Sequence, residues 1–225
     1  MSLGTRHLSV NLFLASANPG KLREFRVAAA ARGIALESVP GIQNLPDCVE
    51  DGATFEENAR QKALHYSRYV NGPVFADDSG LCVDALGGAP GIHSARFAGP
   101  DADDAANNQK LLEELRRVEA AGSGRQSQAS GATRRAAHYI CVIALAERGC
   151  ILTITEGRAE GFIIDGPRGT GGFGYDPFFF FPPLGKTFAE LSPEEKFAVS
   201  HRGEAFRKLL DYLSGVGERH LQRGP

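Results

Sequence analysis

Residues 8–39, LSVNLFLASANPGKLREFRVAAAARGIALESV, decide the fold class. Leu8 to Ala15 is an apolar, β-compatible run and predicts a first strand. Asn18 and Pro19 suit the N-cap and first position of a helix, which is expected to run to about Arg32. After a closing glycine, Ile34 to Val39 predicts a second strand. Strand, helix and strand in this order indicate an α/β protein.

After residue 40 the pattern changes to further helices and antiparallel strands. Thr54 and Ser192 each stand three residues before a glutamate, which is the spacing of a capping box. Parallel pairing early and hairpins late predict a mixed β-sheet flanked by helices. Helices are expected at 54–69, 101–118, from 192 and around 206–213, and strands at 74–76, 137–146, 151–156, 159–164 and 178–181.

The chain reads as a single domain, residues 1–225, because it contains no internal repeat and no convincing linker. Residues 1–7 are expected to be disordered or vector-derived. Residues 119–135 are rich in Gly, Ser, Gln and Arg, and this composition predicts a mobile loop.

Charge and composition narrow the range of partners. The 25 Lys and Arg residues nearly balance 27 Asp and Glu, so no overall field points to nucleic acid or an anionic membrane. No apolar run reaches the roughly 18 residues of a membrane span. The four cysteines have neither metal-binding nor disulfide spacing. These features predict a cytoplasmic protein that binds neither nucleic acid nor membrane.

The turn between the first strand and the first helix is a candidate anion site. Free N–H groups and the positive end of the helix favour an anion there, and Lys21 adds a full charge. The alternative is a plain helix cap, with Asn18 capping and Lys21 in solvent. The spacing of a Walker A loop is absent. The phosphate-binding candidates are Ser16, Ala17, Asn18, Pro19, Gly20 and Lys21.

The helix after Thr54 carries a second polar pair. Asn58 and Lys62 are four residues apart and therefore share one face of the helix. An amide and an ammonium one turn apart suit a polyphosphate, whereas the alternative is an ordinary hydrated face.

Asp77-Asp78-Ser79-Gly80 directly follows the expected strand at 74–76. Two carboxylates at the end of a buried strand are costly unless they meet a cation or hydrogen-bond donors. Magnesium takes such hard oxygen ligands, and Glu50 in a preceding loop could complete the site. Because consecutive strand residues point to opposite faces, the two aspartates are expected to have different roles. The alternative is an Asx-type turn that Asp78 caps.

Residues 169–177, GTGGFGYDP, place four glycines around two aromatics. Glycine lets the backbone approach a ligand, and Phe173 or Tyr175 could stack on a base. The alternative is a glycine-rich turn whose aromatics belong to the core.

Lys196, His201 and Arg202 form a basic cluster at the start of the expected last helix. Such a cluster is commonly a solvated face. His201 and Arg202 could instead donate hydrogen bonds to a carbonyl or to phosphate.

Taken together, these segments resemble the inosine triphosphate pyrophosphatase family, from about Leu12 to Leu213. Six motifs occur in the family's order, and the set is specific although each alone is weak. They are S-x-N-x-x-K (16–21), T-F-x-E-N-A-x-x-K-A (54–63), D-D-S-G-L (77–81), P-G-I-x-S-A-R (90–96), G-G-F-G-Y-D-P (171–177) and S-H-R (200–202).

The resemblance implies an elongated, two-lobed fold with a central cleft, and a homodimer. It implies that the 16–21 loop holds the triphosphate, with Asn58 and Lys62 nearby. Asp78 matches the proposed general base, and Glu50, Asp77 and Asp78 match the acidic neighbourhood of Mg²⁺, for which Mn²⁺ could substitute. Its substrate-contacting positions correspond to Ser79, Phe173, Gly174, Tyr175, Asp176, Lys196, His201 and Arg202.

Three features depart from the family pattern. His93 stands where an aromatic such as tyrosine is common, and Phe197 stands where a polar residue is more usual. The segment 119–135 is longer than typical. None of these changes touches the carboxylates or the 16–21 loop.

The activity that the resemblance implies is hydrolysis of deaminated purine nucleoside triphosphates (ITP, dITP, XTP and dXTP) to the monophosphate and pyrophosphate. Asp78 would activate water, and Lys21 and Lys62 would offset the developing charge. One alternative is a Maf-like pyrophosphatase acting on pyrimidine or modified nucleotides. Another is a non-catalytic nucleotide-binding protein, which would leave the three acids without a purpose. A nucleic-acid-binding module is disfavoured by the charge balance.

Overall fold

The opening strand, helix and strand form as the sequence predicts. The computed structural model describes residues 11–122 and 135–221. Within it, β1 (Asn11–Leu14), α1 (Pro19–Ala30) and β2 (Ala35–Ser38) follow one another. β1 pairs in parallel with β2 on one side and with β3 (Val74–Val83) on the other.

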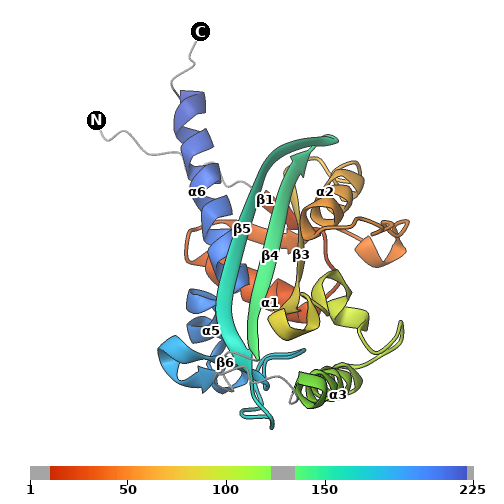
Figure 1. Ribbon diagram of the computed structural model, residues 1–225. Helices are drawn as coiled ribbons and strands as arrows, with labels where there is room; N and C mark the ends of the chain where they lie inside the picture. The colour runs from red at the N-terminus through yellow and green to blue at the C-terminus, as the bar shows by residue number, and fades with distance from the viewer. Residues whose placement is uncertain (1–10, 123–134, 222–225) are drawn as a thin grey trace.

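An antiparallel half continues the sheet. β4 (Ala136–Glu147) pairs with β3, β5 (Cys150–Ile163) pairs with β4, and β6 (Phe179–Phe181) and β7 (Lys186–Thr187) complete the edge. The seven strands lie in the order β2-β1-β3-β4-β5-β6-β7 (Figure 1). The predicted mixed sheet is therefore confirmed.

A two-residue turn joins the two longest strands. Arg148 and Gly149 both have positive φ angles, 50° and 76°. This is the backbone of a type I′ turn, whose twist matches that of the strands it connects. The turn lets β4 and β5 run antiparallel as the central hairpin visible in Figure 1.

Helices cover both faces of the sheet. α1 and α6 (His201–Leu221) pack on one face together with Phe197 of α5 (Pro193–Val199), whereas α2 (Phe55–Tyr66) packs on the other. α3 (Asp104–Gly122) covers the far end of β3 and β4. Short 3-10 turns link these elements: η1 (Ile42–Asn44), η2 (Asp84–Leu86), η3 (Gly91–Arg96), η4 (Pro182–Leu184) and η5 (Phe188–Glu190).

The two predicted helix caps form differently. Ser192 and Glu195 make the reciprocal capping box at the start of α5. The Thr54 hydroxyl accepts a hydrogen bond from the Glu57 backbone N–H at 3.1 Å, as expected at the start of α2. The Glu57 carboxylate, however, accepts from the backbone N–H of Ala53, one residue before the cap.

β4 shows why the middle of the sheet is so apolar. Residues 141, 143 and 145 belong to the core with α1 and α6, and residues 142, 144 and 146 belong to the core with α2. Successive side chains of a strand point to opposite faces, so both faces of β4 are buried and the strand reads as an unbroken apolar run.

Three strand predictions are wrong in extent. The strand expected at 74–76 is the start of the ten-residue β3, and those expected at 151–156 and 159–164 are one strand, β5. The strand at 178–181 is followed by another, β7. In the sequence, Gly157 suggests that one strand ends and another begins, but in the structure the strand continues and α6 packs directly on this glycine. A Cβ there would lie 2.1 Å from the His201 carbonyl oxygen.

The loop prediction for 119–135 is wrong at its beginning, because residues 119–122 belong to α3. At its end, Arg135 forms an ion pair with Glu119 at 2.6 Å. Residues 123–134, and the segment 1–7, lie outside the described residues.

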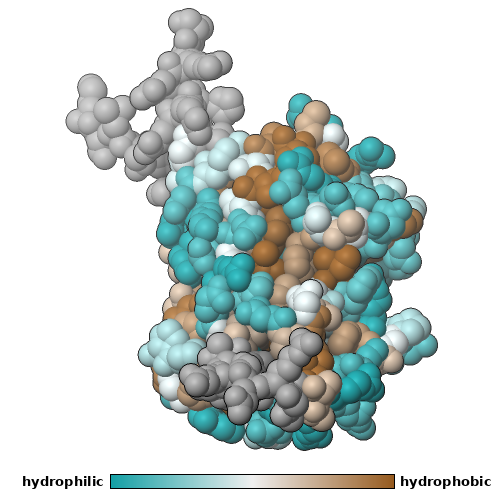
Figure 2. Space-filling model, viewed as in Figure 1, coloured by the Kyte–Doolittle hydropathy of each residue, from teal (hydrophilic) through white to brown (hydrophobic). Residues whose placement is uncertain are grey.

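The surface seen in Figure 2 is largely hydrophilic, with an apolar stripe along the middle of the face where β4 and β5 lie. No helix in the described part of the chain combines the length and the apolar character that crossing a membrane requires.

Candidate active site

A cavity of about 320 Å³ gathers segments that are far apart in the sequence. Its wall includes parts of α1, α2, β3, η3, α3, β4, α5 and α6 and the loop before β6. The size is that of a small-molecule site. The predicted site residues that line it are Asn18, Lys21, Glu50, Asn58, Lys62, Asp78, Ser79, Phe173, Gly174, Tyr175, Asp176, Lys196, His201 and Arg202.

The rest of the predicted residues lie beside this cavity. Ser16 and Ala17 line a neighbouring cavity of about 480 Å³ that shares Glu50 and Lys62 with the first. Pro19 and Gly20 line neither, although a Cβ on Gly20 would lie 3.1 Å from the Phe173 ring. Asp77 is also missing from both walls.

The two aspartates of β3 have different environments. They lie within the strand, not after it, so the Asx-turn alternative is wrong. Asp77 is 1% exposed, and its carboxylate pairs with the Lys21 ammonium at 2.9 Å and accepts from the Ser79 hydroxyl. Asp78 faces the cavity and accepts a hydrogen bond from the Asn58 amide at 3.1 Å. The alternation of side chains along a strand produces this division.

The pKa values of these carboxyls move in opposite directions. Burial opposes ionisation of Asp77, but Lys21, Arg202 and Lys62 together hold its pKa well below its usual range. Burial raises the pKa of Asp78, against the nearby charge of Lys62. A carboxylate that faces a cavity and has a raised pKa suits a general base.

The polar pair on α2 is not a hydrated face. Asn58 is 2% exposed and links Gly52 to Asp78 through its amide oxygen and nitrogen. The Lys62 ammonium pairs with the Glu50 carboxylate at 2.8 Å and donates to the Asp77 carbonyl oxygen at 3.3 Å. We call Glu50, Lys62 and Asp78 the open group, because all three line the cavity and are at least partly exposed.

The turn before α1 caps the helix and carries a cation. The Asn18 side-chain oxygen accepts from the backbone N–H groups of Gly20 and Lys21 at 2.8 and 3.1 Å. Asn18 is thus the N-cap of α1, but Lys21 is not in solvent, because it pairs with Asp77 across the edge of the cavity.

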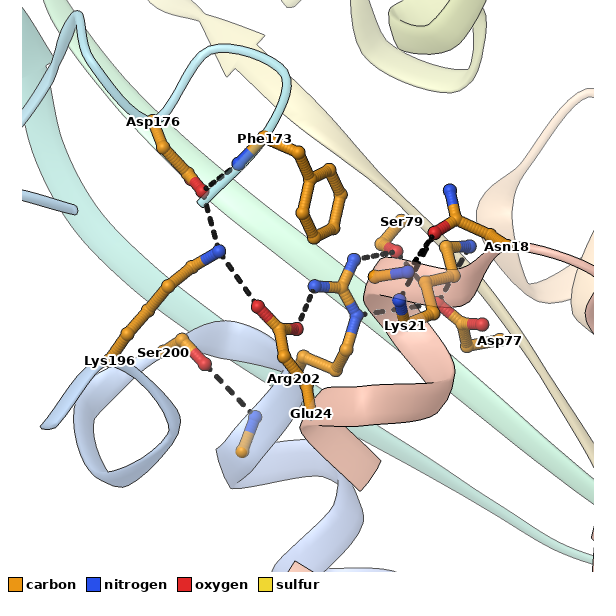
Figure 3. Close-up of polar contacts among 12 residues, drawn as sticks. Asn18, Lys21, Glu24, Asp77, Ser79, Phe173, Asp176, Lys196, Ser200 and Arg202 are labelled. Carbon is orange, nitrogen blue, oxygen red and sulfur yellow. Dashed lines mark hydrogen bonds and ion pairs between the residues drawn. The ribbon is translucent and has the colours of Figure 1, made fainter. Parts of the chain in front are cut away.

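A buried ionic network connects α1, β3, the loop before β6, α5 and α6 beside the cavity (Figure 3). The Lys196 ammonium contacts Asp176 at 2.6 Å and Glu24 at 2.8 Å, and Arg202 contacts Glu24 at 2.5 Å and Asp77 at 3.7 Å. Lys196 and Arg202 are each 4% exposed, so the solvated-face alternative is wrong. We call Glu24, Asp77, Asp176, Lys196 and Arg202 the buried network.

Phe173 lies over the cations of this network (Figure 3). Lys196 and Arg202 lie 4.7 and 5.3 Å from its ring centroid. Asp176 accepts a hydrogen bond from the Phe173 backbone N–H at 2.9 Å, and Gly172 gives that carboxylate room, since a Cβ would lie 2.1 Å from it. The glycine-rich segment therefore places an aromatic ring on the cavity wall.

Several lining residues were missed by the sequence analysis. One of them, Tyr139, resembles a core residue of β4 in the sequence. Glu24 does not line the cavity, but it pairs with Lys196 and Arg202 and resembles any exposed helix acid until α1 packs beside α6. Asp104 accepts from the Gly174 N–H at 2.6 Å, and Tyr175 donates to the Ser94 carbonyl at 2.8 Å. The P-G-I-x-S-A-R motif was the available signal for η3, which also contributes Ile92, Ala95 and Arg96.

Two carboxylates of the cavity suit a cation that binds together with a phosphate-bearing ligand. Among the described residues, no three His, Cys, Asp or Glu side chains converge as in an all-protein metal cage. Glu50 and Asp78 nevertheless line the same cavity. Magnesium in nucleotide sites commonly takes one or two carboxylates plus phosphate oxygens and water, so this pair fits it. Asp77 fits less well, because it is buried and engaged with Lys21.

An open α/β sheet with a cavity that combines lysines, carboxylates and an aromatic ring has the organisation of a nucleotide-handling enzyme. The chain belongs to the Ham1 family, whose model matches residues 12–212.

Relatives of known name support this membership. The chain is 47% identical over 198 residues to the dITP/XTP pyrophosphatase of Geobacillus kaustophilus, covering 88% of this chain and 91% of that protein. It is 49% identical over 221 residues to the dITP/XTP pyrophosphatase of Syntrophobacter fumaroxidans, covering 95% and 89%. A solved HAM1 protein from Coxiella burnetii superposes with a TM-score of 0.77 at 40% identity, covering 92% of this chain and 99% of that one.

Proposed function

We propose that the protein hydrolyses deaminated purine nucleoside triphosphates, ITP or dITP and XTP or dXTP, to the monophosphate and pyrophosphate. The observation that carries the proposal is that Asp78 faces one cavity together with Lys62 and with an aromatic ring, Phe173. The names of the relatives from Geobacillus and Syntrophobacter point to the same substrates.

Magnesium, or manganese in its place, would be held by Glu50 and Asp78 together with phosphate oxygens of the substrate. When bound, it would neutralise phosphate charge that the cavity alone does not offset. The cavity needs this help because Lys62 is already paired with Glu50, and Lys21 with Asp77.

The chain's own groups would then position the triphosphate and handle one proton. Water attacks the α-phosphorus, the bond to the bridging oxygen breaks, and pyrophosphate leaves. Asp78 takes the proton of the attacking water, for which its raised pKa is suitable. Lys21 and Lys62 both line the cavity, both contact Asp77, and would stabilise the charge that develops on the phosphate oxygens.

Base selectivity would come from other residues of the same cavity wall. Phe173 offers a ring for stacking, and Arg202 and His201 offer donors for a 6-keto oxygen. Adenine presents an amino group at that position, which would leave buried donors unpaired, and such mismatches carry a large penalty.

We also infer a homodimer and a cytoplasmic location. The apolar stripe over β4 and β5 is a candidate contact surface for a second copy, since such stripes commonly mark interaction sites (Figure 2). Sedimentation equilibrium of the pure protein tests the dimer: a single monomeric species at micromolar concentration contradicts it.

The activity is tested by incubating the pure protein with Mg²⁺ and ITP, XTP, GTP, ATP or dUTP, and resolving the products by chromatography. We expect IMP or XMP plus pyrophosphate, with ATP and GTP nearly untouched. Orthophosphate as the product, or a preference for dUTP, contradicts the proposal. Omitting the metal, with a chelator present, is expected to abolish turnover.

A further inference from the structure

Tyr139 of β4 connects the hydrophobic core to the cavity. It is 7% exposed, belongs to the core cluster of β3, α3 and β6, and also lines the cavity. Its ring is nearly parallel to the His201 imidazole, with centroids 4.6 Å apart and an interplanar angle of 7°. No motif of the sequence pointed to this residue.

The Tyr139 ring is itself held on the core side. It lies parallel to the Phe188 ring at 5.8 Å and packs against Phe179 at 4.7 Å and 60°. Both phenylalanines are fully buried. A ring packed in this way has little freedom to rotate, so it offers its neighbour a fixed plane.

The Tyr139 ring is the one aromatic partner of His201 among the described residues. His201 is the first residue of α6 and is 2% exposed. Its Nδ1 is buried without a hydrogen-bond partner among the described residues. Burial, with Arg202 and Lys196 nearby, holds the pKa of His201 well below its usual range, so the imidazole is neutral and carries one donor and one acceptor.

We propose that Tyr139 is a positioning residue for base recognition, whose stacked ring fixes the plane in which His201 presents its ring nitrogens to the nucleobase. The proposal rests on the proposed function, since it assumes that a purine binds against this part of the cavity wall. A hydrogen bond weakens steeply when its donor is misaligned, so a freely tilting imidazole would bind the base less well and select it less sharply.

Two substitutions separate the ring from the hydroxyl. Tyr139→Phe keeps the aromatic plane, whereas Tyr139→Leu removes it. Phe181→Leu is the matched control, because Phe181 packs on Phe188 in the same core at 5.6 Å and has no ring contact with His201. It reports the general cost of losing an aromatic from this cluster.

We expect Tyr139→Leu to raise KM for ITP and XTP about tenfold, in line with a lost aromatic stack, and to leave kcat within about twofold. Tyr139→Phe is expected to behave like the wild type. The ratio of kcat/KM for XTP over ATP should fall in Tyr139→Leu and stay unchanged in Phe181→Leu.

Proton NMR of the protein without nucleotide provides a second readout that needs no activity. Protons of the His201 ring lie against the Tyr139 face and should be shifted upfield in the wild type and in Tyr139→Phe. The shift should be lost in Tyr139→Leu, and the spectrum of His201→Gln assigns the signals.

The proposal is overturned if Tyr139→Leu matches Phe181→Leu in KM and selectivity, or if Tyr139→Phe loses as much as Tyr139→Leu. It is also overturned if His201 shows no upfield shift that depends on Tyr139. Failure of the wild type to hydrolyse any purine triphosphate would instead contradict the proposed function, so the two failures are distinguishable.

Discussion

The buried network and the open group hold the same kinds of charge in different ways. In the buried network, the side chains of Lys196 and Asp176 are 4% and 3% exposed. In the open group, those of Lys62 and Glu50 are 13% and 35% exposed. Both pairs line the cavity, but the first is almost wholly buried, whereas the second leaves more of its surface open to solvent and to an entering ligand.

This difference distinguishes residues that hold the site in place from residues that act on the substrate. A buried ion pair cannot exchange partners without leaving a bare charge in an apolar interior, which is costly. A pair that is partly exposed can exchange a carboxylate for a phosphate oxygen or a cation. We therefore expect the buried network mainly to fix the wall of the site, with Arg202 also facing the base, and the open group to act on the phosphates.

Lys196→Met should produce a large loss of stability. The substitution leaves Asp176 and Glu24 without their shared cation, and breaking a buried pair costs about 3–5 kcal/mol. Urea unfolding followed by circular dichroism measures it. Lys208→Met is the control, because Lys208 pairs with Glu204 at side-chain exposures of 53% and 40% and should change the free energy of unfolding by less than about 1 kcal/mol. Equal losses in both variants would contradict the distinction.

Lys62→Met should have the opposite effect: a large loss of activity with little loss of stability. Removing a cation that would contact the phosphates is expected to lower kcat/KM for ITP by about 10²–10³-fold, as for other donors to a developing charge. Its partner Glu50 reaches solvent, so stability should change little. Steady-state kinetics and urea unfolding of the same sample decide it, and a stability loss as large as that of Lys196→Met would place Lys62 in the supporting class.

Gly157→Ala tests whether the close packing of α6 on β5 positions His201 in the cavity. The added Cβ would lie 2.1 Å from the His201 carbonyl oxygen and 2.5 Å from the Ala205 nitrogen. We expect a loss of about 1–3 kcal/mol, typical of overpacking, and a raised KM because His201 and Arg202 move with the helix. Gly166→Ala, which meets nothing within 4 Å, serves as the control for thermal melting and KM. Unchanged behaviour of Gly157→Ala would show that the contact is not limiting.

Because His201 is buried and neutral in the folded protein, it should make the protein less stable at low pH. Its folded pKa lies below the unfolded value of about 6.5, so below that pH the unfolded chain binds one more proton than the folded one. The free energy of unfolding should therefore fall as the pH falls, with this residue contributing a slope of up to about 1.4 kcal/mol per pH unit. His201→Gln should lack that contribution between pH 6.5 and 5, and identical slopes in the two proteins would contradict it.

Local signals account for the parts of the fold that the sequence predicts well. Asn18 caps α1 and the Ser192 capping box opens α5, because these interactions involve residues close together in the chain. The apolar run of β4 indicates a strand buried on both faces. The order of motifs also predicts most residues of the cavity wall.

Long-range packing accounts for the rest. Gly157 looks like a break until α6 lies against it, and Glu24 gains a role only when α5 and α6 bring Lys196 and Arg202 to it. Tyr139 is likewise a plain core residue until His201 stacks on it. No periodicity in a single segment encodes such contacts between distant elements.

The central claim is that Asp78 acts on the substrate while Asp77 supports the fold. Asn substitutions of these neighbouring aspartates of β3 test it most directly. For each variant, kcat with ITP and the free energy of unfolding would be measured together. Asp78→Asn should lower kcat about 10²–10⁴-fold with nearly unchanged stability, because it removes a proton acceptor whose burial already disfavours its charge. Asp77→Asn should lose about 3–5 kcal/mol, because Lys21 and Arg202 lose a buried partner. A stable, inactive Asp77→Asn beside an unstable, active Asp78→Asn would contradict the account.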